Sequence, residues 1–494
     1  MWSNEIWPII SAVLYAMNMG IAVYASVTMI LRRQDPIRTL SWTAVMVLLP
    51  YIGILLYFVF GQNFRKKKIF SRKGLGDVKL RQELCVDEEE KLKKDPRLFS
   101  SENEPYKKLV YQNLKNSYAL IDYNSDIDFY FDGRDALDAM YKAIGEATNH
   151  IHIQTYILED DMTGNRFADL LIKKARSGVE VRLLIDGMGC VSLKKKFLEH
   201  LRQNGIEVLV FSPVRFFMPM SRLNYRNHRK ILVIDGKVGF LGGVNIADRY
   251  YYGTETGDWH DTHIKVIGES VFSLQEGFLL DRYFVLNRKL RYSKKYYPQI
   301  ENQKYDITVE KKNFYSQIIS SGPDSDWAGI MQCYFTAITC ARDHIYLVTP
   351  YFTPNETILN AIKVAALGNI DVRIMLPERA DSATATYSTK SYIGELLEAG
   401  VRIYLFKEGF NHSKVMSIDG CISIIGSANM DARSFEHNFE IMSVLYNSDC
   451  AKIVENRFLQ DAQECDGVNL AKWRKRPVGE KVKESFFRLM SPLM

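Results

Sequence analysis

The chain has 494 residues, room for about three domains, and its 47% hydrophobic and 25% charged content describe a globular protein with an ample core. The formal charge of +6 is modest for this length and fits anionic lipid, nucleic acid or neither as a partner. Seven cysteines, odd in number and never spaced C-x-x-C, argue against a disulfide framework and against a zinc site, and they favour a reducing compartment.

Two long apolar runs open the chain, at residues 6–31 and 40–60. Each meets the requirement of about 20 residues for a helix that crosses hydrocarbon, so we predict two membrane helices, the second bent at Pro50 and Gly53. A cleaved signal peptide is the alternative for the first run, but a basic start and a small-residue cleavage site are missing. More cations follow the second run than lie between the two. The positive-inside rule therefore predicts a multi-pass protein of the cell membrane with its catalytic domain on the cytoplasmic side.

Shifts in composition predict the domain boundaries. Residues 65–120 are dense in charge and poor in large apolar residues, which indicates a partly helical linker that either touches anionic headgroups or is a solvated tether. The predicted domains are a transmembrane hairpin at 1–64, this charged linker, two similar halves at 121–295 and 312–469, and a basic amphipathic tail at 470–494.

Both halves carry the same order of α/β elements. Apolar periodicity predicts helices at 135–148, 166–176, 327–342 and 355–367, and strands at 151–156, 179–185, 344–349 and 370–376. Such a duplication predicts an α/β fold in which two β-α-β halves pack as a pseudo-dimer, with the functional sites at the seam.

The first half differs from the second by an insertion at about residues 215–222. Its mixture of aromatic, methionine and arginine side chains suits a lid over a lipid-facing entrance, and a loop folded over its own core is the alternative. The residues that carry this prediction are Arg215, Phe216, Phe217, Met218, Met220, Arg222 and Arg226.

The tail at 470–494 mixes cations with large apolar residues, which is the composition of a helix that lies in the headgroup plane. Pro477 and Gly479 interrupt it, so the sequence predicts a helix from Glu480 onward. The alternative is that Phe486 and Phe487 pack on the catalytic domain, as apolar pairs at helical spacing often do.

One motif, H-x-K-x-x-x-x-D, appears once in each half. A glycine turn that ends in asparagine follows each copy, at Asn245 and Asn429, and equal numbers of residues separate the two histidines and the two asparagines. The mostly apolar residues after each lysine predict a short buried strand, from one face of which His and Lys project. The six motif residues are His228, Lys230, Asp235, His412, Lys414 and Asp419.

Paired histidines, lysines and asparagines are the groups that a phosphodiester site needs. Ammonium and amide groups bind non-bridging phosphate oxygens, so the candidate phosphate ligands are Lys230, Asn245, Lys414 and Asn429. One imidazole attacks phosphorus to give a phosphohistidine, and the other protonates the leaving alcohol and then deprotonates the incoming one. Fixed cations stabilise the transition state, so this chemistry predicts neither a metal nor a cofactor.

The motif aspartates, Asp235 and Asp419, complete the set of candidate catalytic residues. They differ in parity from the lysines, so we expect them to face away and to hold turns through hydrogen bonds to backbone or arginine. A catalytic histidine usually needs a carboxylate on its second nitrogen. Asp261 and Glu440, each downstream of one motif histidine, are the candidates for orienting the two rings.

These motifs resemble those of the phospholipase D superfamily, whose hallmark is the doubled H-x-K-x-x-x-x-D with G-x-x-N after it. The chain as a whole is similar to the bacterial cardiolipin synthases. Gly243 stands where the second copy has Ser427, a departure from the superfamily pattern that implies different work in the two halves. Besides the motifs, the similarity rests on Asp35-Pro36, on Leu49-Pro50 with Gly53, on Trp259-His260-Asp261-Thr262-His263 and on Ser491-Pro492-Leu493.

The resemblance also implies roles. His228 would be the nucleophile and His412 the acid/base, each oriented by a carboxylate of the opposite half, Glu440 and Asp261 respectively. The implied activity is phosphatidyl transfer between two phosphatidylglycerol molecules at a bilayer, giving cardiolipin and glycerol. The alternatives are a phospholipase D that uses water or another alcohol, and a membrane-tethered nuclease or nucleic-acid-binding protein. No nucleic acid is expected, because the chain lacks a long basic tract with interleaved aromatics, and no obligate protein partner is predicted.

Overall fold

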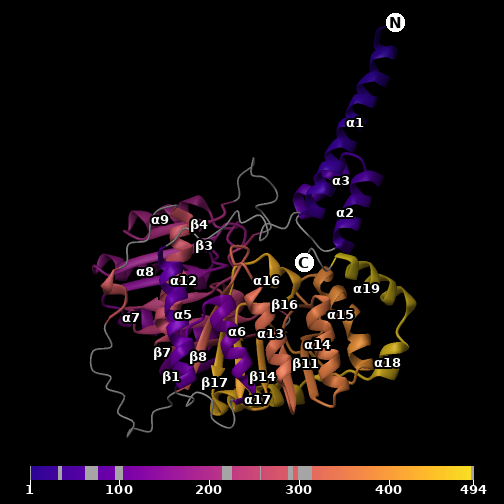
Figure 1. Ribbon diagram of the computed structural model, residues 1–494. Coiled ribbons are helices and arrows are strands. Elements are labelled where there is room, and N and C mark those ends of the chain that lie inside the picture. The colour runs from indigo at the N-terminus through magenta and orange to yellow at the C-terminus, as the bar shows by residue number, and fades with distance from the viewer. Residues whose placement is uncertain are drawn as a thin grey trace. The chain divides into compact units, whose positions relative to one another are not determined.

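A computed structural model describes residues 2–31, 36–61, 76–94, 104–213, 225–255, 257–286, 293–298 and 314–490 (Figure 1). The chain divides into two compact units. The first comprises residues 1–70 and 214–225, and the second comprises residues 71–213 and 226–494.

Among the described residues of the first unit, one helix is long and apolar enough, by length and composition, to cross a membrane: the stretch Trp7–Leu31 has a mean hydropathy of 1.6. The predicted second helix over 40–60 is interrupted, rather than only bent, at Pro50. Helix α2 ends at Leu48, because Pro50 has no N–H to donate and Tyr51 has a φ of 68°. The elements are α1 (Trp2–Leu31), α2 (Pro36–Leu48), α3 (Ile52–Leu56) and the π-helical turn η1 (Tyr57–Gly61).

Helices α1 and α2 nevertheless pack on each other. The hydroxyl groups of Ser26 and Thr43 lie 2.9 Å apart, and the side-chain oxygen of Asn18 accepts a hydrogen bond of 2.8 Å from the N–H of Tyr51 at the break. Asn18 therefore satisfies a backbone donor that the interrupted helix leaves free. A small apolar cluster fills the contact between the helices: Ala22, Ala25, Met29, Met46 and Tyr57.

The second unit is built on two strand arrays of identical topology. In the first half the order is β1-β7-β6-β5-β2-β3-β4, and in the second it is β8-β17-β15-β14-β9-β11-β12, so each strand has a counterpart. The first-half strands are β1 (Asp122–Asp132), β2 (His150–Thr155), β3 (Glu180–Asp186), β4 (Glu207–Phe211), β5 (Ile231–Ile234), β6 (Val238–Gly242) and β7 (Trp259–Gly268). Their counterparts are β8 (Phe314–Ser321), β9 (His344–Val348), β11 (Asp371–Pro377), β12 (Arg402–Phe406), β14 (Val415–Ile418), β15 (Ile422–Gly426) and β17 (Glu440–Tyr446).

A short antiparallel pairing of β1 with β8 joins the two arrays into one 16-stranded sheet within the described residues. Two further β pairings cross the seam within the described residues: β13 (Phe410–Asn411) pairs with β7, and Asn227 bridges to Phe439. The remaining short strands are β10 (Phe352–Thr353) and β16 (Met430–Asp431), which pair with each other, and β18 (Asp466–Gly467) beside β12.

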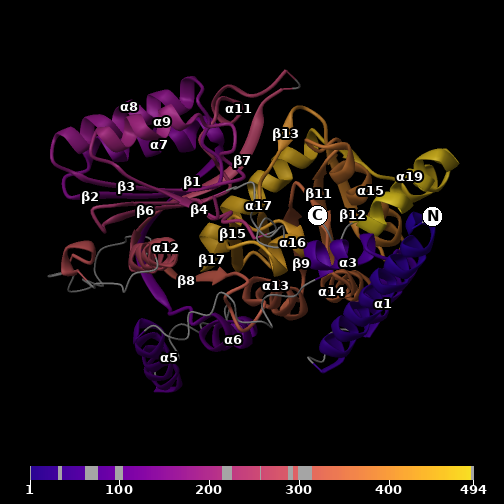
Figure 2. The same ribbon diagram turned by 90° about the horizontal axis from the view of Figure 1, so that it is seen from above.

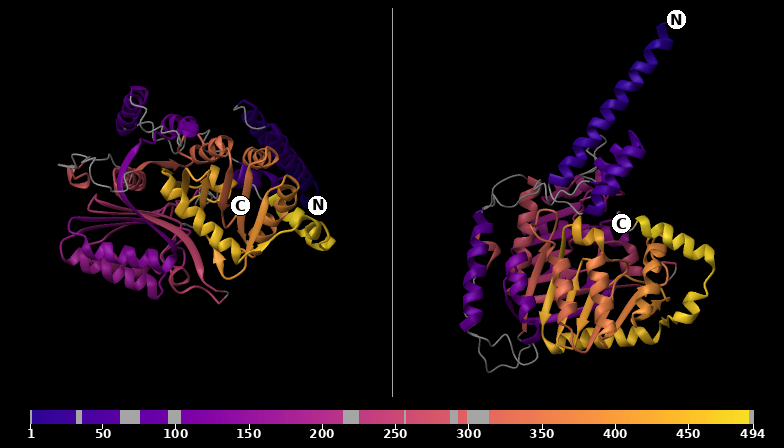
Figure 3. Two further views of the ribbon diagram at one scale, coloured as in Figure 1. Left: turned by 90° about the horizontal axis from the view of Figure 1, so that it is seen from below. Right: turned by 45° about the vertical axis from the view of Figure 1, so that its right-hand side comes forward.

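Helices cover both faces of each array (Figures 2 and 3). The middle core between the arrays takes apolar side chains from both halves, among them Ile231, Val233, Val415 and Ile425 of the two motif strands. The predicted α/β fold with two repeated halves is thus confirmed. The outer helices are α7 (Gly133–Glu146), α8 (Met162–Arg176) and α9 (Lys195–Gln203) in the first half and α13 (Gly329–Cys340), α14 (Glu356–Leu367) and α15 (Ala383–Glu398) in the second, and the inner ones are α12 (Ser270–Leu286) and α17 (Ser448–Gln463).

The predicted linker at 65–120 is only partly a linker. It contains α5 (Gly76–Lys94), η3 (Glu104–Tyr106) and α6 (Lys107–Ser117), and α6 packs against α13 in the core of the second half. Leu109, Val110 and Leu114 are buried there, and the Tyr106 hydroxyl donates a hydrogen bond of 2.6 Å to Asp419. Residues 104–117 therefore belong to the folded second unit, and the expectation of a tether over this stretch is wrong.

The tail forms two helices, α18 (Leu470–Arg474) and α19 (Val478–Met490), which contact α15. The ring of Phe487 stacks on that of Tyr387 with centroids 5.5 Å apart, whereas Phe486 is 60% exposed. The two phenylalanines therefore divide between the predicted alternatives: Phe487 packs on the catalytic domain, and Phe486 does not.

Candidate active site

The two motif histidines lie just before strands β5 and β14, and each is held by the backbone of the opposite half. The N–H of His228 donates to the carbonyl of Phe439 at 2.9 Å, and the N–H of His412 donates to that of His260 at 2.7 Å. These bonds continue the seam contacts of β13 and Asn227. Pairing across the seam therefore fixes where both imidazoles sit.

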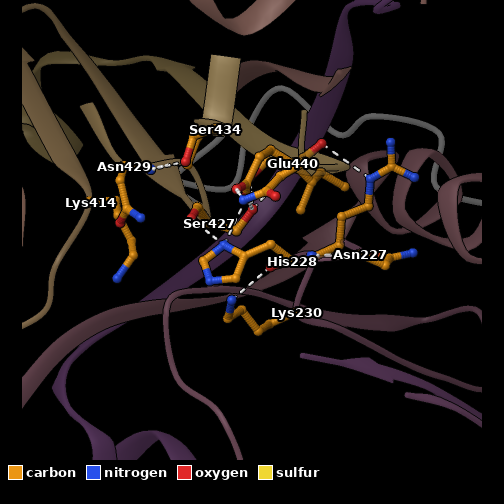
Figure 4. A network of polar contacts seen from close by, with 12 residues as sticks. Asn227, His228, Lys230, Lys414, Ser427, Asn429, Ser434 and Glu440 are labelled. Atoms are coloured by element: carbon orange, nitrogen blue, oxygen red, sulfur yellow. Dashed lines mark hydrogen bonds and ion pairs between the residues drawn. The ribbon is translucent and has the colours of Figure 1, made fainter. Parts of the chain in front are cut away.

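A buried carboxylate from the opposite half contacts each ring. Nδ1 of His228 lies 3.0 Å from Oε2 of Glu440, and Nδ1 of His412 lies 2.6 Å from Oδ2 of Asp261. The ring of His228 has Glu440 and Ser427 on one side and Lys230 on the other (Figure 4). A carboxylate on Nδ1 fixes the ring orientation and leaves Nε2 to exchange a proton or to attack. The crosswise arrangement is the one that the resemblance implied.

The electrostatics of the two pairs differ. Burial lowers the pKa of His228 and, together with the nearby Lys414 ammonium, lowers the pKa of His412 well below its usual value. Burial also raises the pKa of Asp261, to about 6. Glu440 is equally buried, but the charge of His228 and hydrogen bonds hold its pKa below the usual range. Glu440 is thus the more firmly ionised of the two carboxylates.

The motif lysines are buried beneath the histidines. Nζ of Lys230 donates to the backbone oxygen of His228 at 2.7 Å, and Nζ of Lys414 lies 2.7 Å from Nδ1 of His412 and 3.8 Å from Asp261. Burial lowers the pKa of Lys230 to about 7 and that of Lys414 to about 8. Neither lysine lines the main cavity, so their predicted contact with phosphate stays a prediction.

Both histidines line one cavity of about 520 Å³. Its wall also holds Asn245 and Asn429, the two predicted amide ligands. The side chain of Asn245 bridges Tyr250, whose hydroxyl lies 2.6 Å from Nδ2, and the N–H of Ile157, which lies 3.1 Å from Oδ1. The phosphate-binding role of Asn245 and Asn429 stays a prediction, and so do the catalytic roles of the two histidines.

Sequence reasoning missed several polar residues of the same cavity. Arg249 and Arg433 line it, and each follows a motif asparagine by four residues, so the motif repeat extends to an arginine in both halves. Comparing the two copies beyond their asparagines would have revealed this signal. The other missed lining residues include Tyr156, Tyr250, Trp259, Tyr351, Asp381, Asp431 and Asn438.

Like the two motif lysines, the two motif aspartates taken as catalytic do not line the cavity. Asp235 accepts hydrogen bonds from the N–H groups of Thr148, Asn149 and His150, and Asp419 accepts from those of Arg342, Asp343 and His344. Both sit at the far end of the motif strand with positive φ, 55° and 54°. They face away as expected, and each ties the end of its motif strand to the start of the neighbouring strand, β2 or β9.

Most of the predicted lid falls outside the described residues, so its placement is untested. Arg226, which was counted with it, is described and is buried. Its guanidinium lies 3.6 Å from Asp186 and 3.3 Å from the backbone oxygen of Ser212. Arg226 therefore belongs to the folded interior rather than to a lid.

Comparison with known proteins decides the family. The family described as "Cardiolipin synthase, PLD-like domain" matches residues 140–257 and 334–462, and one described as "Phospholipase D-nuclease N-terminal" matches residues 20–62. A cardiolipin synthase from Oceanobacillus iheyensis is 37% identical over 486 residues, covering 97% of this chain and 98% of its own. The chain belongs to the cardiolipin synthase family.

Other relatives of the cardiolipin synthase family agree. The protein of that name from Geobacillus is 37% identical over 477 residues, covering 96% of this chain and 92% of its own. Among solved structures, phosphatidylserine synthase from Haemophilus influenzae matches with a TM-score of 0.59 at 13% identity, over 80% of this chain and all of that one. That likeness concerns the fold of the two repeated halves.

Proposed function

We propose that the chain transfers a phosphatidyl group from one phosphatidylglycerol molecule to another, giving cardiolipin and glycerol. One observation carries the proposal: two histidines line one cavity, and each is held by a carboxylate of the opposite half. A reaction in two similar steps on one phosphorus atom needs a nucleophile and a separate acid/base on either side of it.

In the first step, Nε2 of His228 attacks phosphorus and the bond to the glycerol oxygen breaks. His412 gives its proton to that oxygen, and glycerol leaves. In the second step, His412 takes the proton from a hydroxyl of the second phosphatidylglycerol, whose oxygen attacks phosphorus and displaces His228. Lys230, Lys414 and the cavity arginines would stabilise the charge on the non-bridging oxygens in both steps.

The inequality of the two carboxylates supports this division of roles. The firmly ionised Glu440 stabilises the positive charge that His228 acquires on forming a bond to phosphorus. Asp261, with a pKa of about 6, holds His412 less firmly in its charged form. That suits a group that must both give and take a proton.

The expected site of action is a cell membrane. Helix α1 supplies one segment that could span the bilayer, and its packing with α2 is consistent with a chain that enters the bilayer twice. The larger number of cations after the second apolar run supports a cytoplasmic side for the catalytic halves. Accessibility of engineered surface cysteines to a membrane-impermeant reagent in intact cells and in inverted vesicles tests this sidedness.

The experiment that tests the function uses the purified full chain in phosphatidylglycerol vesicles, with products identified by mass. Cardiolipin and glycerol in equal amounts are expected, and the His228→Ala variant, reconstituted at the same density, is the control. Phosphatidic acid as the main product would show that the chain is a hydrolase. Products unchanged by His228→Ala would refute the proposal.

A further inference from the structure

Helix α19 has two faces of different character. One face rests on α15: Glu484 is buried, Phe487 stacks on Tyr387, and the guanidinium of Arg488 lies 2.6 Å from Glu395. An ion pair of Arg476 with Glu484 fixes the start of the helix to its own preceding turn. These contacts set the rotation of α19 about its axis.

The opposite face is apolar and exposed. Val478, Val482, Phe486 and Leu489 follow one another at intervals of four, four and three residues, which places them in one stripe of an α-helix. They are 75%, 62%, 60% and 79% exposed. A stripe of large apolar side chains turned to water costs free energy, which is recovered when another apolar phase covers it.

The stripe lies near the cavity. Helix α15 begins just after β11, and its first residues, Thr384 and Ala385, form part of the cavity wall. Tyr387, under Phe487, is one turn further along. In Figure 1, α19 lies along the same edge of the second unit as α16 (Ala432–Glu436), which follows the motif asparagine Asn429.

Other exposed apolar residues gather at this edge. β3 pairs in parallel with β2, whose end reaches the cavity at Tyr156, so the residues after β3 lie at the same edge. Among these, Met188 is 39% and Val191 is 66% exposed. Trp327, 56% exposed, follows β8, whose last residue pairs with Glu440.

The charged residues beside the stripe indicate what covers it. Lys481 and Lys483 are exposed and flank the stripe on its two sides. Apolar side chains bordered by lysines match the boundary between acyl chains and anionic headgroups better than they match a second copy of the same basic helix.

We propose that α19 is an interfacial helix that rests on an anionic bilayer through Val478, Val482, Phe486 and Leu489, and so holds the cavity edge against the lipid surface. The inference rests on the proposed function only in naming the lipid as the substrate. Lipid binding by α19 can be measured without turnover, so the two ideas fail separately.

The direct test places an environment-sensitive fluorophore on α19 in the full chain. Phe486→Cys labels the stripe, Glu480→Cys labels the same helix away from it, and the unmodified chain reports labelling of native cysteines. In vesicles that contain phosphatidylglycerol, the label at 486 should shift to the blue and be quenched by brominated lipid, and the label at 480 should change little. Equal, water-like spectra at both positions would overturn the proposal, and so would a protein-concentration-dependent shift without quenching by lipid, which would indicate a second copy instead.

A second, kinetic test applies if the labelled variants fail to fold. The double variant Phe486→Glu, Leu489→Glu should raise the KM for phosphatidylglycerol in vesicles several-fold and leave turnover of a short-chain, water-soluble phosphatidylglycerol unchanged. The double variant Asn456→Glu, Gln460→Glu, at two exposed positions of α17, is the matched control for two added negative charges. An unchanged KM in vesicles would contradict the proposal, and a parallel loss on both substrates would assign the stripe to folding.

Discussion

At the scale of single residues, Gly243 and Ser427 explain why the two halves are unequal. A Cβ atom on Gly243 would lie 1.9 Å from Oδ1 of Asp261, so only glycine lets this carboxylate approach. At the equivalent position Ser427 has room, and its hydroxyl donates to Glu440, as does the side-chain amide of Asn438 at 3.2 Å. Glycine therefore goes with the short aspartate and serine with the longer glutamate. Asp261 accepts a hydrogen bond of 2.9 Å from the backbone N–H of Thr262, whereas Glu440 accepts from a side-chain hydroxyl and a side-chain amide.

The roles of the two histidines can be separated by trapping the covalent intermediate. His228→Ala should abolish the phosphatidyl-enzyme, because the nucleophile is gone. His412→Ala should still form it from an activated substrate whose leaving group needs no proton. Acid-quenched protein, digested and analysed by mass, reports the adduct. Equal adduct in both variants would refute this assignment.

Loss of the Ser427 hydroxyl should change how activity depends on pH. The pKa of Glu440 lies below its usual range, so its charge is lost only as the pH falls through that lowered value. Ser427→Ala removes one donor to a charged group, worth about 1.4 kcal/mol, and should move the acid limb of kcat/KM upward by about one pH unit. Ser423→Ala on the same strand, β15, is the control. An acid limb at the same pH in both variants would contradict the role given to Ser427.

At the scale of elements, equivalent histidines at the starts of β2 and β9 make different contacts. His344 lies 2.7 Å from Glu455 of α17 and 2.7 Å from Asp343, and these carboxylates raise its pKa to about 9. His150 meets the neutral Gln275 of α12 instead, and burial lowers its pKa. Only the second half therefore joins its inner helix to the sheet through a charged histidine.

This contact gives the second half a pH-dependent stability. Because the folded pKa of His344 lies above the unfolded value of 6.5, its contribution is complete below pH 6.5 and is lost as the pH rises through about 9. The free energy of unfolding, measured by denaturant at several pH values, should fall across this interval. Glu455→Gln should flatten the fall, and His200→Gln on α9 should not. An identical fall in the Glu455 variant would refute the assignment.

Much of this architecture follows from sequence periodicity. The predicted strand 344–349 is β9 and the predicted helix 355–367 is α14, each within one or two residues, because a buried strand and a two-faced helix leave strong apolar patterns. Helix α6 was taken as linker because its 11 residues are rich in charge and only one face is apolar. The break at Pro50 was predicted as a bend, since sequence shows that a donor is lost but not what satisfies the free backbone groups.

The sequence predicted the chemical groups of the site but not how deeply each of them is buried. Matched spacing identified both histidines, and Asp261 and Glu440 were candidates from their positions downstream of the motifs. Their crosswise pairing with the histidines came from the resemblance. No pattern in one sequence states that Lys230 and Lys414 lie beneath the histidines rather than on the cavity wall, because that depends on how two arrays distant in sequence pack together.

At the scale of the whole molecule, strand pairing holds the two halves together across the seam. Residues 1–298 and 314–494, produced together as two chains, should therefore associate through the β1–β8 and β7–β13 pairs and through α6, which crosses from the first fragment into the second half's core. Cardiolipin formed by the pair, and by neither fragment alone, is the expected result. Cardiolipin formation by a single fragment would show that one half suffices.

The crosswise carboxylates have a consequence for how such a chain can change over generations. A duplication usually provides redundancy, because one copy can keep the function when a mutation damages the other. Here each half contributes one histidine and the carboxylate that orients the histidine of the other half. A harmful change to either carboxylate therefore impairs the histidine of the opposite half. Duplication in this protein therefore brings interdependence instead of redundancy. The sequences of the surface helices can therefore diverge between the two halves, whereas the residues of the seam cannot change independently of each other.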